Sequence, residues 1–128
     1  WLCGTVLAQV GMALHHKLCH TLGGSLDLPH ADTHAILLPH SIAYNSAAAA
    51  IDLKPVAELF GDPPGTGLYE FAASLDAPMA LKELGVAERD LDTVAELAAK
   101  NPYWNPQPVE KEAIRMLLQR AWDGSPPE

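Results

Sequence analysis

Apolar residues recur along this chain at the spacing of a helix, and prolines and glycines separate one periodic segment from the next. Between positions 68 and 75, one apolar stripe follows positions i, i+3, i+4 and i+7. Its members are Leu68, Phe71, Ala72 and Leu75. No segment has the apolar–polar alternation and β-branched enrichment of a strand. We therefore predict an all-α fold, a bundle of several helices.

The breaks between periodic segments set the expected helix boundaries. The expected helices are 2–22, 30–45, 47–60, 68–75, 79–84, 87–100 and a final helix that begins at Pro108 and stops at Gly124. Gly23 and Gly24 are expected to stop the first helix, and prolines 39 and 55 to bend the second and third. The sequence GDPPGTG at 61–67 predicts a turn, and NPYWNPQ at 101–107 predicts a loop.

Size and charge narrow the class of protein. A length of 128 residues fits one domain, so we expect residues 1–128 to form a single helical domain. The formal net charge of −8 argues against a nucleic acid or an anionic membrane as partner. The uncharged run at 1–16 is shorter than the roughly 20 apolar residues that span a bilayer, which favours a buried helix. Cys3 and Cys19 are too few for a disulfide framework and indicate reduced thiols in a cytoplasmic protein.

All the histidines of the chain lie between Gly11 and Asn45: His15, His16, His20, His30, His34 and His40. His16 and His20 are four residues apart and share one face of a helix. The break at glycines 23 and 24 lets the chain double back, so His30 can reach the same place. Neutral imidazole is a common ligand of zinc and iron. The H-x3-H spacing alone is a weak signal, because the glutamate of the zinc-protease motif is absent.

Other interpretations stay open for some of these residues. His15 points roughly 100° away from His16 on a helix, which favours a hydrogen-bonded core histidine, and we interpret His40 in the same way. His34 lies one turn beyond His30 and can face either the same cavity or the core. Cys19 is better explained as a small buried apolar residue than as a nucleophile, because neighbours on a helix point in different directions.

A resemblance rests on these motifs. The pattern H-x3-H-x9-H followed by AILLPH and YN resembles the C-terminal helical domain of the iron-containing alcohol dehydrogenase superfamily, which has a dehydroquinate synthase-like fold. The segments HHKLCHTLGG, LPHADTHAILLPH, PPGTGLYEFAASL and NPYWNPQPVEKEAIRMLLQRAWDG are similar to its maleylacetate reductase branch. The resemblance covers nearly the whole chain. It implies reduction of maleylacetate to 3-oxoadipate with NADH or NADPH, in bacterial breakdown of aromatic compounds.

The resemblance also implies roles for single residues. By position, His16 and His30 match two metal-binding histidines, for Fe2+ or Zn2+. His20 matches a histidine beside the nicotinamide and the substrate, so it is expected to be both catalytic and cofactor-binding. His34 belongs to the THA pattern of the reductase branch and is expected to act on the dicarboxylate substrate. A cation or imidazolium would polarise the C=O while hydride arrives, and a histidine would supply the proton.

The chain departs from the pattern of the iron enzymes at Ala31, where they usually have glycine, and the reductase branch includes members that work without metal. A metal-free site therefore stays open. The resemblance implies that a nucleotide-binding domain and two further ligands precede Trp1 in a longer two-domain enzyme. We expect the chain alone to be inactive and either to self-associate, as a dimer or other homo-oligomer, or to pack against that domain. The alternatives are a non-enzymatic helical metal-binding or oligomerisation module, and another iron-type alcohol dehydrogenase.

Overall fold

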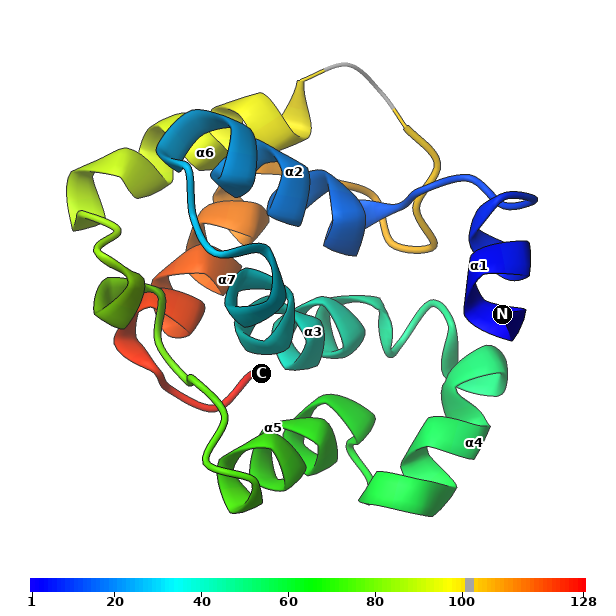
Figure 1. The fold of residues 1–128 in the computed structure, drawn as a ribbon. Coiled ribbons are helices and arrows are strands. Elements are labelled where there is room, and N and C mark those ends of the chain that lie inside the picture. The colour runs from blue at the N-terminus through cyan, green and yellow to red at the C-terminus, as the bar shows by residue number, and fades with distance from the viewer. Residues whose placement is uncertain (101–102) are drawn as a thin grey trace.

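The computed structural model describes residues 1–100 and 103–128, and all regular structure within them is helical (Figure 1). The α-helices are α1 (Leu2–Leu7), α2 (Leu14–Leu26), α3 (His30–Asn45), α4 (Ala50–Phe60), α5 (Pro64–Ser74), α6 (Leu91–Ala99) and α7 (Lys111–Asp123). Two short 3-10 helices, η1 (Leu81–Leu84) and η2 (Glu88–Asp90), lie between α5 and α6. None of the described residues forms a strand, which confirms the predicted all-α class.

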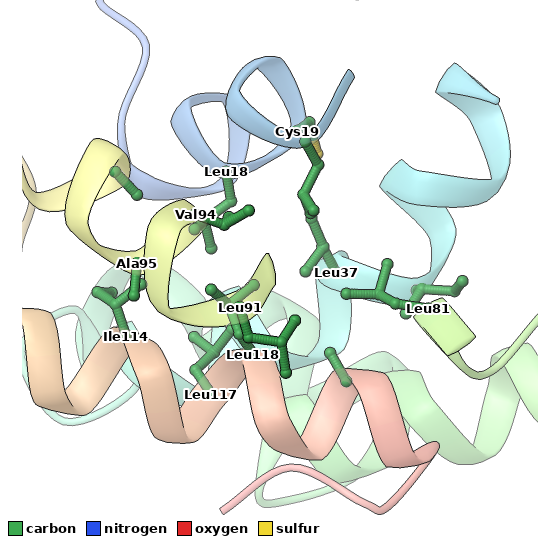
Figure 2. Packing of buried hydrophobic residues seen from close by; sticks show 14 of the residues in the cluster. Leu18, Cys19, Leu37, Leu81, Leu91, Val94, Ala95, Ile114, Leu117 and Leu118 are labelled. Carbon is green, nitrogen blue, oxygen red and sulfur yellow. The ribbon is translucent and has the colours of Figure 1, made fainter. Parts of the chain in front are cut away.

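Helix α3 occupies the middle of the molecule and packs against α2, α5 and α7 (Figure 1). Helix α2 also packs on α6, and α6 packs on α7. The core fills the space between α2, α3, α6 and α7, as Figure 2 shows. Its buried members include Leu18, Cys19, Leu37, Leu81, Leu91, Val94, Ala95, Ile114, Leu117 and Leu118. Both helices that carry histidines are therefore anchored on one side by the core.

The buried residues of α6 and α7 recur at i, i+3, i+4 and i+7, the spacing of one helix face. The buried residues are Leu91, Val94, Ala95 and Ala98 on α6, and Ile114, Leu117, Leu118 and Ala121 on α7. Full burial of a leucine or isoleucine side chain is worth about 1.5–3 kcal/mol relative to exposure. The indole of Trp122 adds a hydrogen bond from Nε1 to the carbonyl of Val86 at 2.7 Å. These contacts hold α6 and α7 together, and α2 packs on α6.

The N-terminal helix differs from the prediction of one buried helix over residues 2–22. Residues 8–13 interrupt it, and α1 is exposed, with Trp1 and Leu2 at 96 % and 69 % relative exposure. Glycines 23 and 24 lie inside α2, which continues to Leu26 and ends at Asp27 in the left-handed region, with a φ of 53°. The extra turn forms because Leu26 packs against the core. That contact outweighs the weak helix propensity of two glycines.

Helix α5 also differs from the prediction. The segment expected to be a turn already contains its first residues, because α5 begins at Pro64. The buried residues of α5 are Pro64, Gly65 and Gly67, whereas Phe71 and Leu75 of the predicted stripe are 47 % and 63 % exposed. Glycine allows the backbone of α5 to lie directly on α3 at this position. No side-chain pattern reports such a backbone contact.

The remaining helices lie where the sequence predicts them, but most begin later. Helix α6 begins at Leu91 and not at 87, α7 begins at Lys111 and not at Pro108, and the helix predicted over 79–84 is the 3-10 helix η1. Helix α3 spans the predicted residues with Pro39 inside it, and α4 begins three residues later than expected with Pro55 inside it. Positions 101 and 102 of the predicted loop lie outside the described residues. Among the helices that the structure describes, none combines the length and the apolar character needed to cross a membrane.

Candidate active site

The histidines gather on the hairpin formed by α2 and α3. Asp27 in the left-handed conformation and Pro29 as the residue before α3 reverse the chain within three residues. Helix α3 then packs along α2. Three histidine rings lie close to that of His34: the ring centroids are 4.2 Å away for His30, 4.8 Å for His15 and 5.5 Å for His16. His20 lies farther out, with its ring centroid 6.4 Å from that of His16. His34 is therefore the centre of the cluster.

The structure places the residues singled out in the sequence at different depths. His16 is half-buried, and His20 and His30 are exposed. His34 is half-buried, and its Nε2 atom is buried without a hydrogen-bond partner among the described residues. Burial and the charges of His30, His16 and His20 lower the pKa of His34. His16 and His30 thus flank one imidazole that is neutral at neutral pH and has a free nitrogen.

These residues fit a metal ion by the chemistry of their donors. Imidazole nitrogens suit both Fe2+ and Zn2+, and a buried nitrogen without a partner is the exception among polar atoms of folded proteins. His16 and His30 each lie beside His34, with ring centroids 5.5 Å and 4.2 Å away, so nitrogen ligands for an ion can come from both helices of the hairpin.

His15 is hydrogen-bonded, as the sequence predicts, and one of its partners is His34 of the histidine cluster. Its Nε2 lies 3.0 Å from Nδ1 of His34, and its Nδ1 lies 3.4 Å from Oγ of Ser41. Burial, followed by the charges of His34 and His16, lowers the pKa of His15 to about 4. Sequence spacing alone places His15 on another face from His16. The contact with His34 depends on how α2 and α3 are rotated against each other.

Cys19 is 1 % exposed, which confirms its interpretation as a buried residue. Its Sγ lies 3.9 Å from Nε2 of His15, and the donor atoms of His15, Cys19 and His34 all lie within 4.8 Å of one another. Burial raises the pKa of the Cys19 thiol to about 12. A thiol that keeps its proton is a poor nucleophile and a poor metal ligand. Since His15 and His34 already contact each other, we interpret these three residues as a hydrogen-bonded network.

His40 lies on the second half of α3, away from the cluster. It is 2 % exposed and its ring lies 6.5 Å from that of Tyr69. The sequence predicts a hydrogen-bonded core histidine here, whereas Nε2 of His40 has no hydrogen-bond partner in the described part of the chain. Burial and the charge of Arg120 lower its pKa to about 4. His40 also lines a cavity of about 480 Å³ together with Tyr44 and Arg120.

A smaller cavity of about 230 Å³ opens on the face that His16 and His20 share. Its lining residues are Met12, His16, Lys17, His20 and Tyr103. Lys17 places a cation there, with Nζ 6.0 Å from the centre of the Tyr103 ring. Sequence reasoning missed Lys17, although its position next to His16 was a usable signal. The face can hold a small anionic group beside two imidazoles.

Asn105 is a second residue that the sequence did not reveal. Its Oδ1 accepts hydrogen bonds from the backbone N–H of Leu14 and from Nδ2 of Asn45, both at 3.3 Å. Its Nδ2 donates to Oδ1 of Asn45 at 2.7 Å and to the carbonyl of Gln107 at 2.6 Å. Asn105 therefore caps the start of α2 and joins it to the end of α3. The two helices of the histidine hairpin are clamped at that end.

A family model described as the C-terminal part of the Fe-containing alcohol dehydrogenase family matches residues 1–122. The chain belongs to the iron-containing alcohol dehydrogenase family. Within this family, it is 66 % identical over 128 residues to maleylacetate reductase from Rhizobium sp. strain MTP-10005, covering all of this chain and 36 % of that enzyme. The fold of the family therefore accounts for the helical arrangement.

Solved structures of the iron-containing alcohol dehydrogenase family have the same fold. Maleylacetate reductase from Agrobacterium tumefaciens superposes with a TM-score of 0.95 at 65 % identity, over 99 % of this chain and 36 % of that one. Iron-containing alcohol dehydrogenase from Corynebacterium glutamicum gives a TM-score of 0.80 at 38 % identity, over 89 % and 33 %. The chain thus spans about a third of the length of the relatives that it matches.

Proposed function

We propose that this chain is the helical catalytic domain of an NAD(P)H-dependent maleylacetate reductase. The observation that carries the proposal is the 66 % identity to such an enzyme along the whole chain. The gathering of His16, His30 and His34 on one hairpin supports it, because that cluster is built entirely from residues of this chain. The proposal includes a separate nucleotide-binding domain, which would hold most of the cofactor, and assembly into a homo-oligomer.

Each residue of the site has a proposed role. His16 and His30 hold a metal ion, Fe2+ or Zn2+, or contact the substrate directly if the enzyme is metal-free. His20 lies against the nicotinamide and acts on the substrate together with His34. Lys17, on the cavity beside His16 and His20, pairs with one carboxylate of the dicarboxylate substrate. This set of cations and imidazoles suits a small dianion.

The reaction adds a hydride and a proton across a carbon–carbon double bond that is conjugated to a ketone. When bound, NAD(P)H supplies the hydride and a divalent cation polarises the ketone oxygen. The imidazole of His20 is exposed at the cavity, so it can exchange a proton with solvent and deliver it to the reduced substrate. Lys17 and the histidines fix the orientation of the dianion. Fixed orientation is itself a large part of the rate enhancement.

A chimera tests this function. The corresponding segment of the Rhizobium maleylacetate reductase is replaced with this chain, and oxidation of NADH and of NADPH is followed with maleylacetate as substrate. We expect turnover by the chimera and none by the 128-residue chain alone. His20→Ala and His34→Ala in the chimera should each lower kcat by about 10²–10⁴-fold, as expected for loss of a general acid or base.

A lysine pair provides a matched control for the substrate-binding role. Lys17→Ala should raise KM for maleylacetate by about tenfold, which corresponds to ~1.4 kcal/mol of lost charge pairing. Lys54→Ala removes a lysine from α4 whose side chain is 74 % exposed, and it should leave KM unchanged. If both variants change KM equally, Lys17 does not take part in substrate binding.

Other outcomes assign the chain differently. A folded chimera that oxidises NAD(P)H with simple aldehydes, but not with maleylacetate, identifies another iron-type alcohol dehydrogenase. A folded chimera without turnover on either substrate favours a non-enzymatic helical module. Loss of activity with a chelator, and recovery with Fe2+ or Zn2+, supports the metal-binding role of His16 and His30. Activity that is indifferent to chelator supports direct contact of these histidines with the substrate.

A further inference from the structure

Four groups form a continuous chain of hydrogen bonds beneath the histidine cluster. Oγ of Ser41 donates to the carbonyl of Leu37 at 2.8 Å. The same oxygen lies 3.4 Å from Nδ1 of His15. On the other edge of that ring, Nε2 of His15 lies 3.0 Å from Nδ1 of His34. Three of these residues are on α3 and His15 is on α2, so the chain crosses the interface between the two helices.

The position of each proton follows from whether each group can donate or only accept a hydrogen bond. The Leu37 carbonyl can only accept, so the single hydroxyl proton of Ser41 is committed to it. Ser41 is 2 % exposed, so no competing donor reaches it from solvent. Its oxygen can then only accept from His15, and Nδ1 of His15 must carry a proton.

The proton on Nδ1 of His15 determines the tautomer of His34. The partners of the half-buried His15 ring are a hydroxyl, another imidazole and a thiol, and no carboxylate of the described residues pairs with it, so an uncompensated charge is disfavoured there. In a neutral imidazole one nitrogen donates while the other accepts. Nε2 of His15 therefore accepts, and Nδ1 of His34 must be the donor. The thiol of Cys19, 3.9 Å from the same Nε2, is a weak donor and agrees with this direction.

His34 is left with a lone pair on Nε2. That atom is buried and has no hydrogen-bond partner among residues 1–100 and 103–128. The ring borders His30 and His16, with centroids 4.2 Å and 5.5 Å away. The hydrogen bonds below the ring thus determine which nitrogen is available to whatever binds beside these two histidines.

We propose that Ser41 and His15 are positioning residues that hold His34 as the Nδ1–H tautomer, with the Nε2 lone pair facing the bound ligand. In this state, His34 accepts a proton or binds a cation, and it cannot donate to a carboxylate. The role of His34 in the reaction rests on the proposed function, whereas its tautomer does not. Outer partners of this kind set the tautomer and orientation of histidines in many sites.

The tautomer can be measured by nuclear magnetic resonance on the 128-residue chain labelled with 15N-histidine. The expected spectrum has a protonated, pyrrole-like Nδ1 and an unprotonated, pyridine-like Nε2 for His34. Ser41→Ala removes the acceptor of His15 and should produce a mixture of tautomers at His34. Ser41→Thr keeps the hydroxyl and should restore the single tautomer. Helix content from circular dichroism reports whether each variant is folded.

Ser74→Ala is the matched control, because the Ser74 hydroxyl also donates to a carbonyl, that of Phe71 at 2.7 Å, but at an exposed position at the end of α5. It should leave the His34 signals unchanged. A protonated Nε2 in the wild type, or an unchanged His34 spectrum in folded Ser41→Ala, overturns the proposal. In the chimera, Ser41→Ala should lower kcat by about 10–100-fold, the usual effect of losing an outer partner. A correct tautomer in an inactive chimera would contradict the proposed function and support the positioning role.

Discussion

A methyl group added at Gly65 tests the direct backbone contact between α5 and α3. A Cβ at this position would lie 2.6 Å from Cβ of Ala43, 2.8 Å from the carbonyl oxygen of Pro39 and 2.9 Å from the backbone nitrogen of Ala43. Non-bonded heavy atoms prefer about 3.5–4.0 Å. Two of the three neighbours are backbone atoms of α3, which cannot rotate away. The Gly65→Ala variant must therefore push the two helices apart.

The size of the effect follows from two opposing terms. Overpacking of a buried contact costs about 1–3 kcal/mol, and contact with backbone atoms favours the upper end of that range. Alanine regains up to about 1 kcal/mol of helix propensity. We expect a net loss of about 2 kcal/mol in the free energy of unfolding. For a chain of this length, that loss corresponds to a decrease in Tm of about 8 °C.

The same substitution at Gly24 of α2 provides the control. No atom lies within 4 Å of a Cβ at Gly24, so alanine adds propensity without a clash. Gly24→Ala should raise the free energy of unfolding by about 0.5–1 kcal/mol. Urea unfolding followed by circular dichroism measures both variants. A Gly65→Ala variant as stable as the wild type, beside a stabilised Gly24→Ala, would refute the packing of α5 on α3.

Three further predictions concern the hydrogen bonds of Asn105, the stability of the fold at acid pH and the reactivity of the two cysteines. Asn105→Ala should cost about 2–4 kcal/mol in urea unfolding, because the partners on α2 and α3 lose their hydrogen bonds. The pKa of His40 lies at about 4 in the folded chain, below its ordinary 6.5. The unfolded chain therefore binds a proton that the folded chain excludes, and stability should be full above pH 6.5 and fall towards pH 4. His40→Leu should remove up to about 3 kcal/mol of that loss, as judged from urea unfolding across this pH range. Exposed Cys3 should react with iodoacetamide in the native chain, whereas buried Cys19 should react only after unfolding, as judged by mass.

Each of these predictions has a contradicting result. Wild-type stability of Asn105→Ala would mean that Asn45 and Leu14 find other partners without it. An acid dependence of stability that is identical in the wild type and in His40→Leu would contradict the low pKa of His40, whose facing groups are Arg120 on α7 and Tyr69 on α5. Two thiols modified in the native chain would contradict the burial of Cys19.

The sequence predicts the fold where helices bury side chains. The prediction of helices at α6 and α7 is correct because apolar residues such as Leu91, Val94, Ile114 and Leu118 recur at helical spacing and are buried. The prediction is wrong at α5, where Gly65 buries backbone against α3. Hydrophobic periodicity reveals only apolar side chains, so it cannot predict a contact that the backbone of a glycine makes.

The candidate site was predictable in location but not in arrangement. The spacing of His16, His20 and His30 indicates one shared face, and the cluster does lie on the α2–α3 hairpin. Its centre is His34, and the partner that holds His34 is His15. Both facts depend on how far α2 is rotated against α3, which is determined by core contacts of residues such as Leu18 and Leu37. The catalytic and metal-binding roles of these histidines stay predictions.

The histidine hairpin and its clamp differ in how far apart their partners lie along the chain. His15 and His34 are 19 residues apart, whereas Asn105 is 91 residues from Leu14 and 60 from Asn45. Closing a short loop costs less chain entropy than closing a long one, and contacts close in sequence form early in folding. During synthesis from the N-terminus, the two histidine helices can pair long before Asn105 emerges. The clamp then closes over a hairpin that is already assembled.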